Sequence, residues 1–477
     1  MKVCVLQPDY STSTVDYRLY DPPRDLAVLL PQHTVDHVAL HKLSTYRQIK
    51  ELSHQGYDIF VNLNEGYLEW DVPSIDVIHS LELFNLPYTG PPAHLYHLPK
   101  PLMKYVAHTV GVRTPAHGLV RQAADAGAVA SRLTFPLFVK PAFAGDSLGV
   151  DDQSLVHNER ELLAKVQAIL GEYDELLVEE FIDGREFTVL VLGSTEVGGA
   201  CRALKPVEFI FPEGGSRFKT YALKTSDLHP SANVPLEDEA LGQRLKDAAC
   251  KVFTAFGGVG YARMDFRMNA AGELFFLEVN FTCSVFYSGG YEGSADYILR
   301  YDGIGPSGFA EAIIAEGLAR HHRRRRRYRM QGNGVSGYGI FATEALAEGD
   351  VIFHGEERAH RLVTKHHVLT HWQADDRQAF RHYAVPVSAE VYALWDEDPV
   401  DWSPQNHSCD PNAEYRGLDI VARRAISAGE ELTLDYAMMM NEQSEPFRCT
   451  CGAATCRGSV HGAVGNSVSA REEARQP

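Results

Sequence analysis

The most informative part of this 477-residue sequence reads Tyr261-Ala-Arg-Met-Asp-Phe-Arg267, then the turn-like Asn269-Ala-Ala-Gly272, then Glu273-Leu-Phe-Phe-Leu-Glu-Val-Asn280. The pattern predicts two strands joined as a hairpin. Strand alternation places Arg263 and Asp265 on one face, and Glu278 and Asn280 on one face of the returning strand. Charged groups between apolar flanks need compensation, and hard oxygen ligands suit Mg²⁺ that bridges nucleotide phosphates. The alternative is a surface hairpin with one salt bridge.

Two further segments indicate a phosphate site. One is the apolar strand Phe135-Pro-Leu-Phe-Val-Lys-Pro141, which ends in Lys140 and is followed by Gly145-Asp-Ser-Leu-Gly149. A lysine before a short Gly-Ser loop offers a cation and backbone N–H groups to phosphate oxygens. The other is the strand-like Leu176-Leu-Val-Glu-Glu-Phe-Ile-Asp-Gly-Arg-Glu-Phe-Thr-Val189, with spaced acids at Glu179 and Glu186.

In this order, the segments resemble the ATP-grasp superfamily, specifically its D-alanine–D-alanine ligase-like branch, from about residue 55 to 320. The match includes Phe60-Val-Asn-Leu-Asn-Glu-Gly66 and Leu86-Pro-Tyr-Thr-Gly90. The resemblance implies that a substrate carboxylate takes the γ-phosphoryl group of ATP and that an amine then displaces phosphate. It implies contacts with ATP for Lys100, Lys104, Lys140, Ser147, Glu179, Glu186 and Lys224, binding of Mg²⁺ by Asp265, Glu278 and Asn280, and a role for Arg263 at the transferring phosphoryl group.

Two segments depart from the resemblance. The stretch from Leu6 to Asp25 lacks the Gly-rich opening with which D-alanine ligases hold the first amino acid. After Asn280 the chain reads Phe-Thr-Cys-Ser284, where that family has small residues and proline. We therefore expect an intact ATP half, an altered acceptor half and poor use of D-alanine. Cys283 is interpreted as an inert buried thiol, with a place in the altered pocket as the alternative.

Half of the eight cysteines lie close together near the carboxyl end. Cys449-Thr-Cys451 is followed by Cys456, and Cys409 lies upstream. Structural zinc prefers four tetrahedral ligands, so the sequence predicts a zinc site of Cys409, Cys449, Cys451 and Cys456. The other cysteines are scattered singly, which indicates a reducing compartment and favours metal over disulfides. They are Cys4, Cys201, Cys250 and Cys283.

Cys409 lies within Asn406-His-Ser-Cys-Asp-Pro-Asn412. Together with Gly337-Tyr-Gly-Ile-Phe-Ala342, Gly429-Glu-Glu-Leu-Thr-Leu-Asp-Tyr436 and the cysteine triplet, it resembles the SET-domain methyltransferases with a post-SET motif, over about 335–458. The resemblance implies binding of S-adenosylmethionine by Gly337, Tyr338, Gly339, Asn406 and His407, and implies that Tyr436 is the catalytic tyrosine. Transfer needs a neutral amine aligned behind the sulfonium carbon, so positioning and desolvation carry most of the work.

Composition sets limits on the class of protein. Hydrophobic residues make up 45% and charged residues 23%, which excludes a disordered or fibrous chain. The net charge of −18 argues against a nucleic-acid partner. The sequence has no apolar run of transmembrane length and no signal-like start, so we expect a cytoplasmic protein without membrane contact.

The most obvious break is Arg320-His-His-Arg-Arg-Arg-Arg-Arg-Tyr-Arg329, interpreted as a solvated linker, with docking onto an acidic surface as the alternative. The predicted fold is α+β or α/β, with an ATP-grasp domain followed by a mostly β SET domain and a zinc-binding loop. The predicted divisions are an ATP-grasp domain at 1–320 with a preceding subdomain at about 1–100, a basic linker at 321–334, a SET domain at 335–445, the zinc motif at 446–460 and a disordered tail at 461–477.

The leading hypothesis is a bifunctional enzyme: an ATP-dependent carboxylate–amine ligase fused to an S-adenosylmethionine-dependent methyltransferase that acts on lysine or a related amine. Its cofactors would be ATP, Mg²⁺, S-adenosylmethionine and Zn²⁺. Its partners would be small-molecule carboxylates and amines, or a lysine-bearing peptide or protein. One alternative is a protein-lysine methyltransferase whose ATP-grasp half only binds nucleotide or substrate. Another is a nucleotide-responsive scaffold in which both sites are silent.

Overall fold

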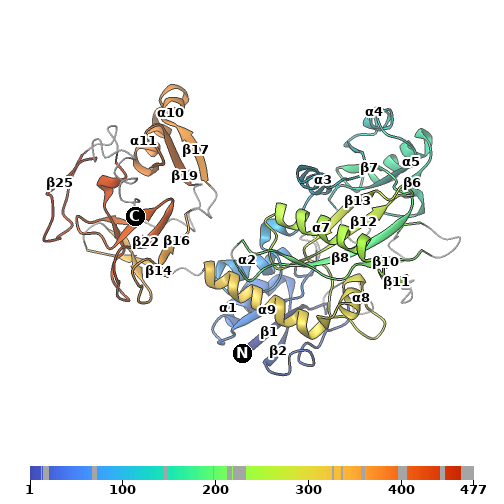
Figure 1. Cartoon of the computed structure of the whole chain (residues 1–477), viewed down its shortest axis with the longest axis horizontal. Helices are drawn as coiled ribbons and strands as arrows, with labels where there is room; N and C mark the ends of the chain where they lie inside the picture. The colour runs from blue at the N-terminus through green and yellow to red at the C-terminus, as the bar shows by residue number, and fades with distance from the viewer. Residues whose placement is uncertain are drawn as a thin grey trace. The chain divides into compact units, whose positions relative to one another are not determined.

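The chain forms two units, Met1–Arg324 and Arg325–Pro477 (Figure 1). The computed structural model describes residues 1–11, 13, 21–66, 72–143, 148–196, 198–211, 217–218, 232–324, 327–334, 337–355, 360–395, 405–440 and 446–462. Two predicted ATP ligands, Ser147 and Lys224, lie outside these ranges, as does the predicted tail beyond residue 462. Among the helices within these ranges, none is long and apolar enough to cross a membrane.

The first unit begins with a parallel sheet in the order β2-β1-β3. Its strands are β1 (Lys2–Pro8), β2 (Thr34–Leu40) and β3 (Ile59–Asn62), and its helices are α1 (Thr45–Leu52), α2 (Ile75–Leu83) and α9 (Gly305–Arg324). The apolar β3 is buried throughout, as expected of a parallel strand covered on both faces. Because parallel strands end at one edge, the residues after Pro8 and Asn62 lie on the same side of the sheet.

A four-stranded antiparallel sheet follows, in the order β4-β7-β5-β6. Its strands are β4 (His117–Val120), β5 (Leu137–Pro141), β6 (Leu155–Val156) and β7 (Leu176–Glu180), and helices α4 (Asp125–Ala130) and α5 (Glu159–Ile169) accompany it. Apolar residues of both helices and of this sheet form one core. One face of the sheet is therefore covered by helices.

The larger sheet of this unit has the order β11-β10-β8-β12-β13, with β9 beside β8. Its strands are β8 (Arg185–Leu192), β9 (Arg202–Ala203), β10 (Val207–Phe209), β11 (Asn233–Pro235), β12 (Tyr261–Met268) and β13 (Leu274–Asn280), and the helices are α3 (Lys100–Thr109), α7 (Glu239–Ala255) and α8 (Ser294–Tyr301). Helix α7 lies across this sheet (Figure 1) and buries Leu241, Leu245 and Val252. Gly257, at a φ of +62°, follows the helix end.

The second unit consists mainly of short strands. They are β14 (Tyr328–Gly332), β15 (Tyr338–Ala342), β16 (Val351–Phe353), β17 (His360–Thr364), β18 (Val385–Pro386), β19 (Val391–Trp395), β20 (Asn406–His407), β21 (Ala413–Arg416), β22 (Asp419–Ala422), β23 (Thr433–Leu434), β24 (Phe447–Arg448) and β25 (Ser459–Val460), with helices α10 (Lys365–His371) and α11 (Ala374–Tyr383). Two similar segments, 342–352 and 422–432, pair with each other: Leu346 and Ile426 exchange both backbone hydrogen bonds at 2.9 Å. The two similar segments are therefore strand-turn units that pair through backbone hydrogen bonds.

Most described residues of the segment 321–334 belong to secondary structure, while their side chains stay exposed or partly exposed. Helix α9 continues to Arg324, and Tyr328–Gly332 form β14, which pairs with β15. Arg320, the first residue of the basic run, is 4% exposed and donates to the carbonyl oxygens of Tyr88 at 2.7 Å and Gly90 at 2.8 Å. Composition suggested solvent exposure, but a buried arginine is tolerated here because backbone acceptors satisfy its guanidinium.

Candidate active sites

A buried carboxylate bridges two lysines in the first unit. Glu179 of β7 lies 2.6 Å from Lys140 Nζ at the end of β5 and 2.6 Å from Lys104 Nζ of α3. Burial alone would raise the pKa of Glu179, but Lys104 and Lys140 outweigh it and lower the pKa to about 2. Burial would lower the pKa of Lys140, but Glu179 and Glu278 raise it, so this lysine stays charged. The bridge holds a permanent cation at the end of β5.

The predicted hairpin places its polar residues in opposing pairs. Asp265 of β12 faces Glu278 of β13, and Arg263 faces Asn280. Opposing side chains on one face of an antiparallel pair lie close enough to share a ligand. Thr188 donates to Asp265 Oδ1 at 2.8 Å and orients that carboxylate. Two carboxylates and an amide oxygen on one strand pair are the ligand types that Mg²⁺ prefers, so these residues fit the ion.

Some of these groups line one pocket, whose walls come from β5, β7, β8, β12 and β13, whereas Lys104, Arg263 and Asn280 are not among its lining residues. Its lining includes Lys100, Lys140, Glu179, Glu186, Asp265, Arg267 and Glu278, together with the apolar Phe138, Phe181 and Phe218. Phe138 and Phe218 pack edge to face, with 4.9 Å between ring centroids. A pocket with an aromatic wall at one end and cations with carboxylates at the other matches the two halves of a nucleotide.

Two of the predicted residues, Lys104 and Glu186, have partners that the sequence did not indicate. Lys104 is 1% exposed and lies behind Glu179, so it positions that carboxylate. Glu186 lies 3.7 Å from Arg267, which the sequence analysis missed. Arg267 is 3% exposed, and its guanidinium lies over the Phe181 ring at 4.6 Å. Strand alternation could have identified Arg267, because it follows Asp265 by two positions on the same face.

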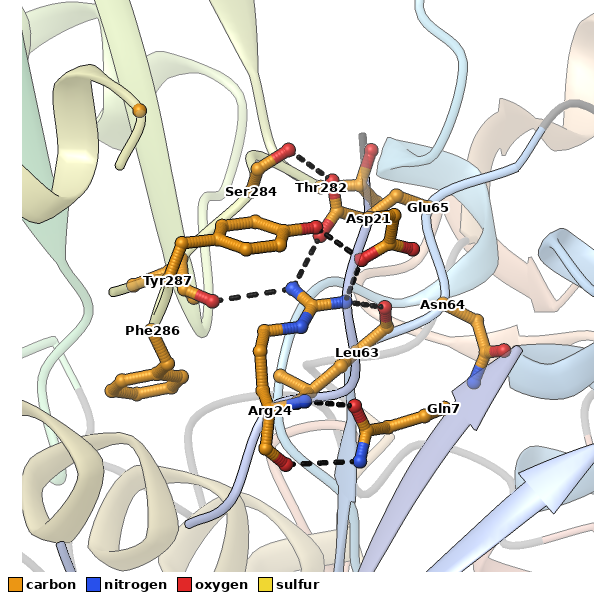
Figure 2. A network of polar contacts seen from close by, with 12 residues as sticks. Gln7, Asp21, Arg24, Leu63, Asn64, Glu65, Thr282, Ser284, Phe286 and Tyr287 are labelled. Atoms are coloured by element: carbon orange, nitrogen blue, oxygen red, sulfur yellow. Dashed lines mark hydrogen bonds and ion pairs between the residues drawn. The ribbon is translucent and has the colours of Figure 1, made fainter. Parts of the chain in front are cut away.

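A second polar network joins the two segments that depart from the ligase pattern (Figure 2). Arg24 is buried between Asp21 at 3.2 Å and Glu65 at 3.1 Å, and it also donates to the carbonyl oxygens of Leu63 and Val285. The ring of Tyr287 lies over this arginine, with 4.4 Å between the ring centroid and the guanidinium carbon. The departures near residue 24 and residue 285 therefore build a single site.

Hydroxyl groups complete this network. Tyr10 and Tyr287 both donate to Asp21, and Ser284 donates to Glu65. Burial raises the pKa of Glu65 to about 7, against the lowering effect of Arg24. Ser284 follows Asn280 by four residues, so the network begins just beyond the carboxylate hairpin. Cys283, between them, is 1% exposed.

In the second unit, Asn406 is held beside Gly339. The Asn406 side-chain amide donates to the Tyr338 carbonyl and to Glu431 Oε1, both at 2.8 Å. A Cβ added at Gly339 would lie 2.0 Å from Glu431 Oε1, so a larger residue here would displace the Glu431 side chain. The structure thus brings together the predicted residues of 337–339 and Asn406, and adds Glu431 as the group that orients them.

His407 connects Tyr436 with a cysteine. Its Nδ1 accepts from the Tyr436 backbone N–H at 3.1 Å, and its Nε2 lies 3.3 Å from Cys409 Sγ. Burial lowers the pKa of His407, which favours the neutral ring. A neutral ring that accepts at Nδ1 carries its proton on Nε2 and therefore donates to the Cys409 sulfur. Tyr436 donates its own hydroxyl to the Gln405 carbonyl at 2.5 Å.

The cysteine cluster has dimensions suited to zinc. Cys409 Sγ and Cys449 Sγ are 3.7 Å apart, and ligands about 2.3 Å from a tetrahedral ion lie roughly 3.8 Å apart. The sulfur of Cys451 accepts from the Cys409 backbone N–H at 3.4 Å. The close group contains His407, Cys409, Cys449 and Cys451, while the exposed Cys456 donates to the Cys449 carbonyl at 3.9 Å. The structure thus gathers three of the predicted thiols and places Cys456 at the edge of the group.

Comparisons with known proteins match each unit to a family. The family model for the D-ala D-ala ligase C-terminus matches residues 108–285, and the SET domain model matches residues 337–437. The D-alanine–D-alanine ligase of Bordetella petrii is 33% identical over 239 residues, which are 49% of this chain and 69% of that protein. An uncharacterized protein of Sinorhizobium fredii is 33% identical over 224 residues, which are 46% of this chain and 63% of that protein.

The solved structure of the D-alanine-D-alanine ligase from Coxiella burnetii has a TM-score of 0.50 and 19% identity, and covers 68% of this chain and 97% of that chain. This likeness shows that the first unit has the ATP-grasp fold. Through that unit the chain belongs to the D-alanine–D-alanine ligase family, and its second unit carries a SET domain. Both are enzyme domains, one of a ligase family and one of a methyltransferase family.

Proposed function

We propose that this protein is a bifunctional enzyme that joins a carboxylate to an amine with ATP and transfers a methyl group from S-adenosylmethionine to an amine. The main observation is the pocket that combines the Lys140–Glu179–Lys104 bridge with the opposed pair Asp265 and Glu278. A nucleotide-binding module without chemistry needs phosphate cations, but it has no need of paired carboxylates at the phosphate end.

In this proposal the phosphates of ATP lie against Lys100 and Lys140. Asp265, Glu278 and Asn280 would hold Mg²⁺, which neutralises charge on the phosphate oxygens. Arg263 lies 3.4 Å from Asp265 Oδ2, on the strand face that carries the carboxylates. There it would stabilise the negative charge that develops on the oxygens of the transferring phosphoryl group in the transition state.

The network around Arg24 would bind the acceptor-side substrate. Arg24 Nη1 and Nη2 contact Asp21, Glu65 and two backbone carbonyl oxygens, so this arginine organises the site rather than binding a ligand itself. The side chains of Asp21 and Glu65 are 22% and 26% exposed. With two carboxylates to one guanidinium, the site favours a ligand with a protonated amino group, which would also keep Glu65 ionised.

We expect D-alanine to stimulate ADP formation only weakly, because this acceptor site departs from the D-alanine ligases. In a panel of amino acids and amines, Glu65→Gln should raise the KM for the best acceptor-side substrate about 10-fold or more, the usual effect of losing one charged hydrogen bond. The KM for ATP should stay unchanged, because Glu65 is not part of the nucleotide pocket. Efficient D-alanyl-D-alanine synthesis by the wild-type enzyme would contradict this assignment.

In the SET unit, the segment 337–339 and Asn406 would bind S-adenosylmethionine, and Tyr436 would lie where the amine meets the methyl group. Zinc would be held by Cys409, Cys449 and Cys451, with Cys456 as the fourth ligand. His407 is unsuited to that fourth place, since its Nε2 proton is directed at the Cys409 sulfur. His407 would instead tie the zinc thiolate to the backbone of Tyr436.

We expect about one zinc ion per chain. Cys449→Ser and Cys456→Ser should both lower the zinc content, because each removes a ligand from a closed tetrahedral site. His407→Ala should retain zinc. Elemental analysis of chelator-washed protein measures this, and zinc-free protein that still transfers methyl groups would refute the site.

The two activities would serve one product, since the ligase consumes an amine and the methyltransferase modifies one. A fully methylated amine cannot attack an acyl phosphate, so methylation would follow ligation or act on a different amine. Incubation of metabolite and peptide pools with ATP, Mg²⁺ and labelled S-adenosylmethionine, followed by mass spectrometry, tests this. A ligation product that never acquires the label would show that the two reactions are independent.

A further inference from the structure

Two cysteines that are far apart in sequence face each other in the first unit. Cys201 precedes β9, and Cys250 lies on α7. The Cys201 thiol donates to the Cys250 carbonyl at 3.8 Å, and the Cys250 thiol donates to the Cys201 carbonyl at 3.8 Å. This reciprocal arrangement holds each sulfur against the backbone of the other cysteine and so places the two residues side by side. The hydroxyl oxygen of Thr254 lies 4.0 Å from the Cys201 sulfur.

The pair is open to small reagents. Both residues are partly exposed and border a surface hollow whose other lining residues are Val110, Ala200, Lys251, Thr254 and Ala255. Cys4 and Cys283 provide the contrast, with exposures of 0% and 1%. Of the four scattered cysteines, only Cys201 and Cys250 are therefore accessible to solvent.

The local chemistry favours the thiolate at Cys201, while the hydrogen bond to Cys201 and burial raise the pKa of Cys250 and keep its thiol protonated. Hydrogen bonding from Cys250 lowers the pKa of the Cys201 thiol to about 7. Burial raises the pKa of both Cys4 and Cys283 to about 12. Since the thiolate is the reactive form, Cys201 should react first at neutral pH, with Cys250 in place as its resolving partner.

We propose that Cys201 and Cys250 form a redox modification site that closes to an intrachain disulfide when the protein meets a peroxide. The Cys201 thiolate attacks one oxygen of hydrogen peroxide, the O–O bond breaks, and hydroxide leaves with Cys201 oxidised to a sulfenic acid. The Cys250 sulfur then attacks the sulfenic sulfur, and water leaves. In total, two thiols and one hydrogen peroxide give one disulfide and two water molecules.

The bond would fasten the start of β9 to α7. Helix α7 packs through Leu245 and Val252 on the sheet that carries Asp265. A thiol reductant should reverse the modification, since both sulfur atoms stay partly exposed. The site thus differs in chemistry and in place from the cysteine cluster of the second unit.

The test treats the zinc-loaded, full-length protein with hydrogen peroxide, blocks remaining thiols with N-ethylmaleimide and digests it without reductant. Mass spectrometry should find a peptide joining Cys201 to Cys250, which dithiothreitol removes. Cys4 and Cys283 should be alkylated only after unfolding, which makes them internal controls. In Cys250→Ser, where no resolving thiol remains, dimedone should label Cys201.

Two results would overturn the proposal. One is recovery of Cys201 and Cys250 as alkylated free thiols after treatment that oxidises cysteines of the second unit. The other is a linkage of Cys201 to a different cysteine in the folded protein. Because the first measurement uses the wild-type chain, it does not depend on whether the Cys250→Ser variant folds.

Discussion

Glu278→Gln is expected to lower the rate of Mg²⁺-dependent ADP formation about 100-fold or more. Glu278 faces Asp265 across the β12–β13 pair and lines the nucleotide pocket, and glutamine keeps its size but loses the charge that binds the metal. Removal of one such group from a site where charge develops costs roughly 3 kcal/mol of transition-state stabilisation. The measurement is ADP release with a carboxylate and an amine both present.

Lys140→Ala should have an effect of similar size, because it removes the cation at the end of β5 and one of the two partners of Glu179. The matched control is Glu273→Gln. Glu273 lies at the turn of the same hairpin, where Asn269 and Arg113 contact it outside the pocket. If Glu273→Gln and Glu278→Gln lose activity equally, the effect belongs to the fold of the hairpin and the metal assignment is wrong.

Tyr436→Phe and Asn406→Ala are expected to abolish methyl transfer while ADP formation continues at the wild-type rate. Phenylalanine keeps the packing of the Tyr436 ring near His407 and Phe447, so only the hydroxyl and its bond to the Gln405 carbonyl are lost. Alanine at 406 removes the amide that joins Tyr338 to Glu431. Loss of positioning alone typically reduces such a rate about 100-fold or more.

The reason for unchanged ATP turnover is that the two sites lie in separate units, Met1–Arg324 and Arg325–Pro477. Both activities should be measured on the same preparation, with labelled S-adenosylmethionine for one and ADP release for the other. A folded Tyr436→Phe protein that loses both activities to the same degree would contradict the assignment of separate sites.

Apolar patterns that repeat with the period of a strand or a helix predicted several elements of the fold. The alternation in 261–280 predicted both strands, their turn and the shared face of Asp265 and Glu278, because strand geometry repeats every two residues. Leu241, Leu245 and Val252 recur at helical spacing before Gly257, a pattern typical of a helix and its end. The basic run carries no comparable signal, because composition cannot show that Arg320 reaches buried carbonyl oxygens.

The sequence by itself determined the two families and the hairpin, since each depends on motifs or on neighbours a few positions apart, and it predicted the residue types of the candidate metal sites. Only the tertiary structure decided which distant groups meet. It placed Lys104 behind Glu179, Arg24 between Asp21 and Glu65, and Cys201 against Cys250. The physical reason is that charge compensation and thiol contact act over a few ångströms of space, and chain folding sets those distances independently of separation along the sequence.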